Sequence, residues 1–276
     1  MQKQTVIGFI GAGNMAFALI SGLLAGKFLA QNIKISDLDK PLLKQRKAEF
    51  GVETFSNNAK LVRQCDVVIL AVKPQILPTI CQELREHITH KPLIISIAAG
   101  IKSSSIAGWL AGDLSIVRAM PNTPALLGMG ATGMIANAAC TAKQKKLTEQ
   151  IIGSVGLCFW VENEEMMDAV TALSGSGPAY LFLLIESMAN TAVALGLDEE
   201  IARKLSVQTA LGASMMASKS DDSAAQLRAK VTSKNGTTQA AIESFQEQDF
   251  ELIVSRAMRA AADRAREIGA EFDSNE

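Results

Sequence analysis

The chain has 276 residues, 48% of them hydrophobic and 5% aromatic, and its formal net charge is −1. This length allows one large domain or two smaller ones around a sizeable core. The near-zero charge offers no electrostatic basis for binding nucleic acid or an anionic membrane.

The cysteines and the N-terminal residues favour a cytoplasmic protein. The four cysteines have no metal-type spacing, so we expect free thiols, a reducing compartment and no metal site; they are Cys65, Cys81, Cys140 and Cys158. The first residues, MQKQ, lead directly into an apolar run, so we expect no cleavable signal peptide. The longest apolar stretch, Tyr180–Leu195, is shorter than a spanning helix and contains Glu186 and Asn190, so no membrane partner is expected.

A glycine-rich turn follows the first predicted strand, Val6–Ile10, and opens a predicted helix, Asn14–Leu24. Its residues are Gly11, Ala12, Gly13, Asn14, Met15 and Ala16. Gly11 permits a tight turn, Gly13 lets a pyrophosphate approach the backbone, and the helix N-terminus offers free N–H groups and a positive dipole end. Asp37 stands at the distance typical of a ribose ligand, so the pattern favours a dinucleotide site. The alternative is a glycine-rich turn in an ordinary α/β protein.

The first 110 residues alternate strand and helix patterns, which predicts a mainly parallel, doubly wound sheet of the Rossmann type. Strands are predicted at Val6–Ile10, Ile33–Ser36, Val67–Ala71 and Leu93–Ile97. Helices are predicted at Asn14–Leu24, Pro41–Glu49, Asn58–Gln64 and Ile76–His87.

Two predicted strand ends fall where an open parallel sheet binds ligands, beyond the carboxyl ends of its strands. One runs into Ala71-Val72-Lys73-Pro74 and the other into Ala98-Ala99-Gly100. Both are expected beside the glycine turn, where ribose and nicotinamide would pass. Alternatively, Pro74 only starts a helix and Gly100 only ends a strand.

A stiff, extended loop is predicted at Met120-Pro121-Asn122-Thr123, after a strand, because its prolines restrict the backbone. It suits placement against a ligand, although a rigid connector would look the same. A strand at Gly128–Ala136, a helix at Thr141–Ser154 and an edge strand at Leu157–Val161 follow.

From Glu162 onward the pattern is helical, so we divide the chain into a dinucleotide-binding domain, 1–162, and an all-α dimerisation and substrate domain, 163–276. Residues 147–202 contain no Lys, Arg or His, and so uncharged a helix is expected to be buried in a core or against another subunit. Ser174–Pro178 should loosen or kink it. Further helices are predicted at Asp198–Ser218, Ser223–Lys230, Gly236–Gln246 and Phe250–Ile268.

A second possible anion site lies at Ser233-Lys234-Asn235-Gly236-Thr237-Thr238, where a turn precedes a helix that the threonines can cap. A small carboxylate would suit it. The alternative is a helix cap with nothing bound.

The residues that are missing also restrict the chemistry. The only histidines, His87 and His90, are expected at the end of a surface helix opposite the site, so the proton relay of a lactate- or malate-type dehydrogenase is absent. The long helix also lacks the lysine used by β-hydroxyacid and 6-phosphogluconate dehydrogenases. A cyclic imine, already protonated as an iminium, fits a site without a strong acid.

Six motifs in this order closely resemble the pyrroline-5-carboxylate reductase family over nearly the whole chain. They are GFIGAGNMA, AVKPQ, SIAAGI, RAMPNTPA, LSGSGPAY and VTSKNGTT. The resemblance implies an N-terminal Rossmann domain, a helical C-terminal domain, a homodimer of interlocked helices and assembly into a decamer. It also implies reduction of 1-pyrroline-5-carboxylate to L-proline by direct hydride transfer from NADPH or NADH.

The resemblance assigns residues to both ligands. For the cofactor it implies Gly11, Ala12, Gly13, Asn14 and Met15 at the pyrophosphate, Asn58 near the adenosine, and Ala71, Val72, Lys73, Pro74, Ala98, Ala99, Gly100, Met120, Pro121, Asn122 and Thr123 around ribose and nicotinamide. For the substrate it implies Ser174, Gly175, Ser176 and Gly177 at the reacting centre, Gly236, Thr237 and Thr238 at the carboxylate, and Glu164 as a further contact. Ser174 and Thr238 are the expected catalytic residues.

Two departures affect these expectations. Where the family often has SPGGTT, this chain has SKNGTT, so Lys234 adds a charge that could aid carboxylate binding. Asp37 favours NAD(H) and would repel a 2′-phosphate, whereas Ser36 and Lys40 could accept one if Asp37 turns away. We expect NADP(H) to be preferred and NAD(H) to be possible.

The rival functions are another imine or ketone reductase, such as a β-hydroxyacid or F420-linked enzyme, and a dinucleotide-binding regulator without turnover.

Overall fold

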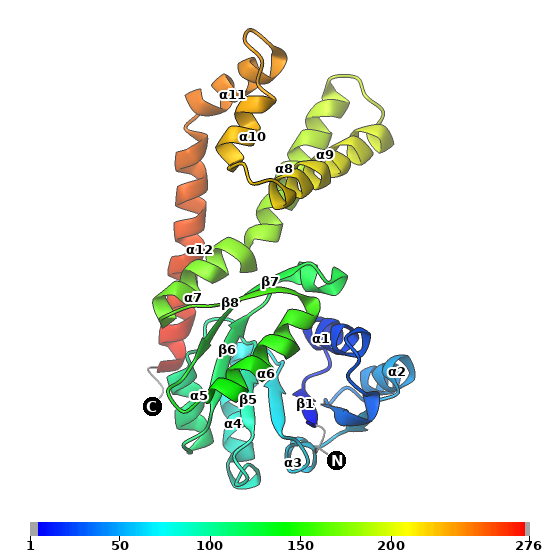
Figure 1. The fold of residues 1–276 in the computed structure, drawn as a ribbon, viewed down its shortest axis with the longest axis vertical. Coiled ribbons are helices and arrows are strands. Elements are labelled where there is room, and N and C mark those ends of the chain that lie inside the picture. The colour runs from blue at the N-terminus through cyan, green and yellow to red at the C-terminus, as the bar shows by residue number, and fades with distance from the viewer. Residues whose placement is uncertain (1–4, 274–276) are drawn as a thin grey trace. The chain divides into compact units, whose positions relative to one another are not determined.

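The computed structural model describes residues 5–273 and contains an eight-stranded sheet in the order β3-β2-β1-β4-β5-β6-β7-β8 (Figure 1). The strands are β1 (Ile7–Ile10), β2 (Ile33–Ser36), β3 (Glu53–Phe55), β4 (Val67–Leu70), β5 (Leu93–Ser96), β6 (Ile116–Met120), β7 (Gly130–Ala136) and β8 (Gly156–Trp160). β1 to β6 are parallel, β7 is antiparallel to β6, and β8 is parallel to β7. The first six strands have the order of a doubly wound dinucleotide-binding fold.

Helices cover both faces of this sheet (Figure 1). One core joins the sheet to α1, α2 and α6, with Leu19 and Ile151 among its buried residues, and the other joins it to α3, α4 and α5, with Leu77 and Ile106. Because the inner strands are covered on both sides, they are apolar along their whole length rather than alternating. The helices of this part are α1 (Asn14–Ala25), α2 (Lys40–Phe50), α3 (Asn58–Val62), α4 (Leu77–Leu84), α5 (Ser103–Leu110), α6 (Ala142–Ile152) and α7 (Glu164–Val170).

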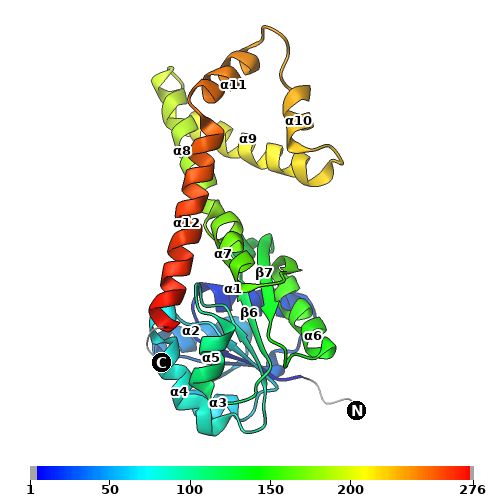
Figure 2. The ribbon, with the colours of Figure 1, turned by 90° about the vertical axis from the view of Figure 1, so that its left-hand side faces the viewer.

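The contacts divide the chain into two compact units. The first contains residues 1–176 and 261–276, and the second contains residues 177–260. This division differs from the predicted domains because α7 and the end of the last helix, α12 (Phe250–Asp273), pack on the sheet domain. The Phe272 ring lies edge-on to Trp109 of α5 with centroids 6.2 Å apart, and Figure 2 shows this end of α12 beside α5.

The second unit is wholly helical. It contains α8 (Gly177–Ala194), α9 (Glu199–Lys219), α10 (Ala224–Lys230), α11 (Thr237–Glu247) and the first part of α12. α8 packs along α9, but no α8 side chain is buried within the chain, and Phe182 and Leu183 are each 64% exposed. Burial of this uncharged helix in the chain's own core is therefore wrong, and burial against another subunit is the alternative that remains.

Several local details differ from the sequence prediction. The short strand β3 and helix α5 were not expected, because three residues give little periodic signal and the three serines and glycine of α5 are weak helix formers. The predicted helix Ile76–His87 is α4 flanked by 3-10 turns. The expected irregularity near Ser174 is confirmed as a π-helical turn, Thr171–Gly175.

Candidate active site

The glycine turn lies where the strand order reverses, between the carboxyl ends of β1 and β4. Gly11 has φ +101°, and a Cβ on it would lie 2.3 Å from the carbonyl oxygen of Ala71. Gly13 is exposed, and no atom lies within 4 Å of the position a Cβ would take. Gly13 is also the N-cap of α1, and no side chain caps this helix. The turn therefore offers an open cradle and helix N–H groups that fit a pyrophosphate.

Two side chains hold the middle residue of the turn. Asp37 accepts the N–H of Ala12 at 2.8 Å, and its other oxygen accepts the N–H of Asp39 at 3.0 Å. Arg46 is buried, donates from Nε to the Ala12 carbonyl at 3.1 Å and lies over the Phe17 ring. Asp37 is thus turned toward the glycine turn, and the Ala12 N–H is already used by the protein.

The remaining expected cofactor residues occupy neighbouring positions on the same edge. The Ser36 hydroxyl donates to Asn58 Oδ1 at 2.8 Å. Lys73 is exposed and starts the 3-10 turn that contains Pro74. Gly100 is buried with φ +78°, and a Cβ on it would lie 2.6 Å from Ile268, so this glycine is required for packing against α12.

The loop after β6 contacts the π turn. A Cβ on Gly175 would lie 2.6 Å from Cε of Met120, so the two segments pack closely. Asn122 donates from Nδ2 to the Ser174 carbonyl at 3.0 Å and accepts the Ala131 N–H at 2.9 Å. The structure thereby brings the expected nicotinamide loop together with the first residues of the expected substrate motif.

The Ser174 hydroxyl is engaged within its own helix. It donates to the Val170 carbonyl at 3.1 Å. Within the π turn, the Ser176 N–H donates to the Thr171 carbonyl at 2.8 Å, five residues back. Ser174 and Ser176 therefore have fixed backbone positions at the turn.

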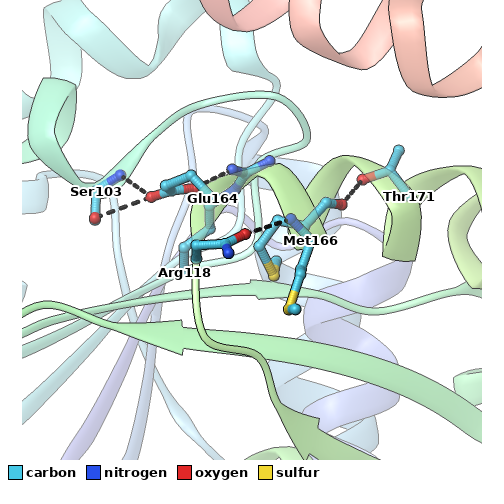
Figure 3. Close-up of polar contacts among 7 residues, drawn as sticks. Ser103, Arg118, Glu164, Met166 and Thr171 are labelled. Atoms are coloured by element: carbon cyan, nitrogen blue, oxygen red, sulfur yellow. Dashed lines mark hydrogen bonds and ion pairs between the residues drawn. The ribbon is translucent and has the colours of Figure 1, made fainter.

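Glu164 is engaged by other protein groups. Its carboxylate pairs with Arg118 of β6 and accepts the backbone N–H and the hydroxyl of Ser103 at 3.1 and 3.0 Å (Figure 3). Arg118 is 2% exposed, and its Nη2 has no hydrogen-bond partner among residues 5–273. Burial raises the pKa of Asp168, one turn further along, although Arg118 lowers it. These contacts join β6, α5 and α7.

The expected carboxylate residues lie in the second unit, which is described by itself. Gly236 is the N-cap of α11, and no side chain caps it, so the prediction that Thr237 and Thr238 cap this helix is wrong. Both threonines lie in its first turn instead. Asn235 has φ +58°, a left-handed conformation that asparagine adopts more readily than most residues, and Lys234 is exposed.

The cysteines and histidines have defined surroundings in the structure. All four cysteines are free, and burial raises the pKa of Cys65 and of Cys81 to about 12. Within residues 5–273 no three His, Cys, Asp or Glu residues gather as a metal site would require. His87 lies beside Arg63, and His90 beside the Cys65 carbonyl.

Sequence reasoning gave no role to two arginines. Arg118 could have been noticed as a charge within the buried strand IVRAM, since a buried charge needs a partner. Arg46 offered no such signal, because KQRK on a surface helix is typical of a solvated face.

The comparisons with known proteins cover both halves of the chain. A family model described as pyrroline-5-carboxylate reductase dimerisation matches residues 164–268, and one described as NADP oxidoreductase, coenzyme F420-dependent, matches residues 6–100. The pyrroline-5-carboxylate reductase of Pseudomonas aeruginosa is 47% identical over 262 residues, which are 95% of this chain and 96% of the relative.

Solved structures agree with this similarity. A pyrroline-5-carboxylate reductase from Coxiella burnetii has a TM-score of 0.91 at 41% identity, covering 96% of this chain and 98% of the other. The Plasmodium falciparum pyrroline carboxylate reductase with NADP bound has a TM-score of 0.86 at 30% identity, covering 98% and 100%. The similarity extends over both compact units. The chain therefore belongs to the pyrroline-5-carboxylate reductase family.

Proposed function

We infer that the protein is an oxidoreductase that reduces the C=N bond of 1-pyrroline-5-carboxylate with a nicotinamide cofactor, giving L-proline in the last step of proline biosynthesis. The observation that carries this inference is 47% identity to a pyrroline-5-carboxylate reductase along 95% of the chain. The open cradle at Gly13 supports it, because that cradle fits a pyrophosphate.

The proposed mechanism depends on positioning. When bound, the cofactor would supply a hydride from nicotinamide C4 to the imine carbon of the iminium, which is C2 in the numbering of 1-pyrroline-5-carboxylate, and the C=N π pair would move to the ring nitrogen. Met120–Thr123 would hold the nicotinamide side, and Ser174 and its neighbours through Gly177 the reacting carbon. Holding the nicotinamide and the reacting carbon in near-attack geometry can lower the activation free energy by several kcal/mol. Because the Ser174 hydroxyl donates to Val170, its role would be to position the substrate rather than to act as a strong acid.

The substrate carboxylate would bind at the start of α11. The uncapped N–H groups after Gly236 and the hydroxyls of Thr237 and Thr238 suit an anion, and the exposed Lys234 adds a positive charge. Lys234→Ala should raise KM for pyrroline-5-carboxylate more than KM for the cofactor. An unchanged substrate KM would remove Lys234 from the site.

Turnover is the direct test of the function. Oxidation of NADPH, followed by its ultraviolet absorbance with 1-pyrroline-5-carboxylate, should be rapid and should yield L-proline. A folded protein that binds dinucleotide without oxidising it would instead be the regulator considered above.

For the cofactor we propose NADP(H) in preference to NAD(H). Asp37 is turned to the glycine turn and accepts two N–H groups, which removes part of the expected repulsion of a 2′-phosphate. Asn58 receives the Ser36 hydroxyl on Oδ1, so its Nδ2 side can donate to a phosphate oxygen. The exposed Lys40 lies nearby along the chain.

The ratio of kcat/KM for NADPH and NADH tests this preference. Asn58→Ala should lower kcat/KM for NADPH more than for NADH, because only NADPH has the 2′-phosphate. Equal losses with both cofactors, or a strong wild-type preference for NADH, would assign the specificity to Asp37 instead.

We propose that the helical unit forms a homodimer and that the dimers assemble into a decamer. Between α8 and α9 lies a groove of about 370 Å³ lined by Phe182, Ile185, Val193 and Val207 among others. The run Glu164–Ala194 is long and apolar enough to cross a membrane by length and composition, with 6% of its apolar window buried within the chain. We assign this surface to the subunit interface and the protein to the cytoplasm, since its four thiols are free.

A further inference from the structure

The side chain of Asn122 joins two segments that lie next to the proposed reaction centre. It is 8% exposed, and its amide is used at both ends. Nδ2 donates to the carbonyl of Ser174 in the π turn, and Oδ1 accepts the N–H of Ala131 in β7. The amide therefore connects the turn to the sheet through protein groups alone.

The chain itself explains why the Ser174 carbonyl needs this donor. In an α-helix it would accept the N–H of residue 178, but residue 178 is proline and has no N–H. Ser174 is half-buried, so its carbonyl would be poorly solvated if it lost this donor. Asn122 satisfies this carbonyl from outside the helix and so holds the π turn at a defined place.

The same loop touches the π turn at a second point. The Cε methyl group of Met120 lies 2.6 Å from the position that a Cβ on Gly175 would take. A shift of the Asn122 bond would therefore change the packing of Met120 on Gly175. These residues are the ones expected beside the nicotinamide and the reacting carbon.

We propose that Asn122 is a positioning residue for hydride transfer, acting through the Ser174 carbonyl and the Ala131 N–H rather than by contact with the cofactor. This indirect role takes the place of the direct cofactor contact that the family resemblance implies for Asn122. The proposal rests on the function inferred above. The distance between hydride donor and acceptor depends on how the π turn meets the Met120–Thr123 loop, and the Asn122 amide sets that meeting point.

The experiment compares Asn122→Asp with Asn137→Asp. Asn137, which follows β7, is a matched control because its amide also bonds two backbone groups, both at the start of β6: it donates to the Leu114 carbonyl at 2.8 Å and accepts the Ile116 N–H at 3.1 Å. It lies beside the start of β6, at the opposite end from the loop. Each aspartate keeps the acceptor and removes the donor.

Kinetics of the full-length enzyme separate positioning from stability. Asn122→Asp should lower kcat about 100-fold, the effect of a displacement on the order of 1 Å, with Kd for NADP(H) nearly unchanged. The primary isotope effect on kcat with C4-deuterated NADPH should rise, because hydride transfer becomes limiting. Asn137→Asp should keep kcat and the isotope effect of the wild type. If the introduced aspartate prevents folding, Asn122→Ala and Asn137→Ala replace the two aspartate variants.

Two results would overturn the proposal. Equal kcat in the Asn122 and Asn137 variants would show that the bond is only structural. Loss of NADP(H) affinity with kcat retained at saturation would show a direct cofactor contact.

Hydrogen exchange at Gly175 and Ser176 supplies a readout independent of turnover: it should be faster in the Asn122 variant and unchanged in the Asn137 variant. A wild-type protein without turnover would refute the inferred function while leaving this readout interpretable.

Discussion

Gly11 and Gly13 stand two positions apart in one turn, yet the structure requires them for different reasons. Gly11 has a positive φ and no room for a Cβ beside Ala71, so it is needed for folding. Gly13 has an extended backbone with open space in front of it, so folding does not require a glycine there. Its conformation and space point to a ligand that approaches the backbone.

Substitution should separate these two roles. Gly13→Val should leave the melting temperature nearly unchanged and weaken NADP(H) binding at least about tenfold, the loss of one hydrogen bond to a charged group. Gly11→Ala should lower the free energy of unfolding by more than about 1 kcal/mol because of strain at positive φ. Calorimetry and cofactor titration measure both effects. Unimpaired binding in Gly13→Val would place the pyrophosphate elsewhere.

The elements around β6 are joined by an ion pair between a buried arginine and a half-buried glutamate, and no local pattern specifies this pair. Arg118 is 2% exposed and lies 46 residues before Glu164, the first residue of α7. Glu164 also accepts two bonds from Ser103 at the start of α5. The pair therefore fixes the position of α7, and with it the π turn that follows α7 in the chain.

Breaking one side of this pair should be costly. Glu164→Ala leaves the Arg118 guanidinium buried without its partner and should lower the free energy of unfolding by about 3 kcal/mol. Glu165→Ala is the matched control, because it removes a neighbouring exposed acid from the same first turn of α7. Urea unfolding measures the free energy of unfolding of both variants.

The double variant tests the interpretation. Arg118→Met combined with Glu164→Leu should be more stable than Glu164→Ala, because it removes the buried charge together with its partner. Equal stability of Glu164→Ala and Glu165→Ala would contradict a role for the pair in holding α7.

For the whole molecule, the decisive feature is how much apolar surface a single chain leaves exposed. Phe182, Leu183 and Leu195 of the helical unit are 64%, 64% and 83% exposed, although exposed apolar faces of this extent are typical of interaction sites. The matching family model is described as a dimerisation region and covers residues 164–268. This surface is the one that we propose a second copy of the chain covers.

Charges placed on α8 should therefore separate the subunits. We propose that each site combines the Rossmann domain of one subunit with the helical domain of its partner. Phe182→Glu with Leu183→Glu should therefore give a monomer in sedimentation experiments that still binds NADP(H) but has lost turnover. Leu29→Glu, which charges an exposed leucine of the other compact unit, is the control. An active monomer would show that one chain contains the complete site.

The sequence alone determined the elements whose signals are local. β2 spans Ile33–Ser36 as predicted, and β1 differs from its prediction by one residue, because continuous apolar runs between turns specify buried strands directly. The glycine turn and the six ordered motifs likewise indicated the dinucleotide fold and the family. These features depend on neighbours in the chain, so periodicity and spacing were sufficient.

Only the tertiary structure decided which residues meet. Asp37, expected at a ribose, accepts the Ala12 N–H, and Glu164, expected at the substrate, pairs with Arg118. Asn122 was expected at the cofactor but bonds Ser174, 52 residues away. The sequence identified these side chains as important without giving their partners. A hydrogen bond forms between groups that the packing of whole elements brings within about 3 Å, and one-dimensional spacing contains no measure of that distance.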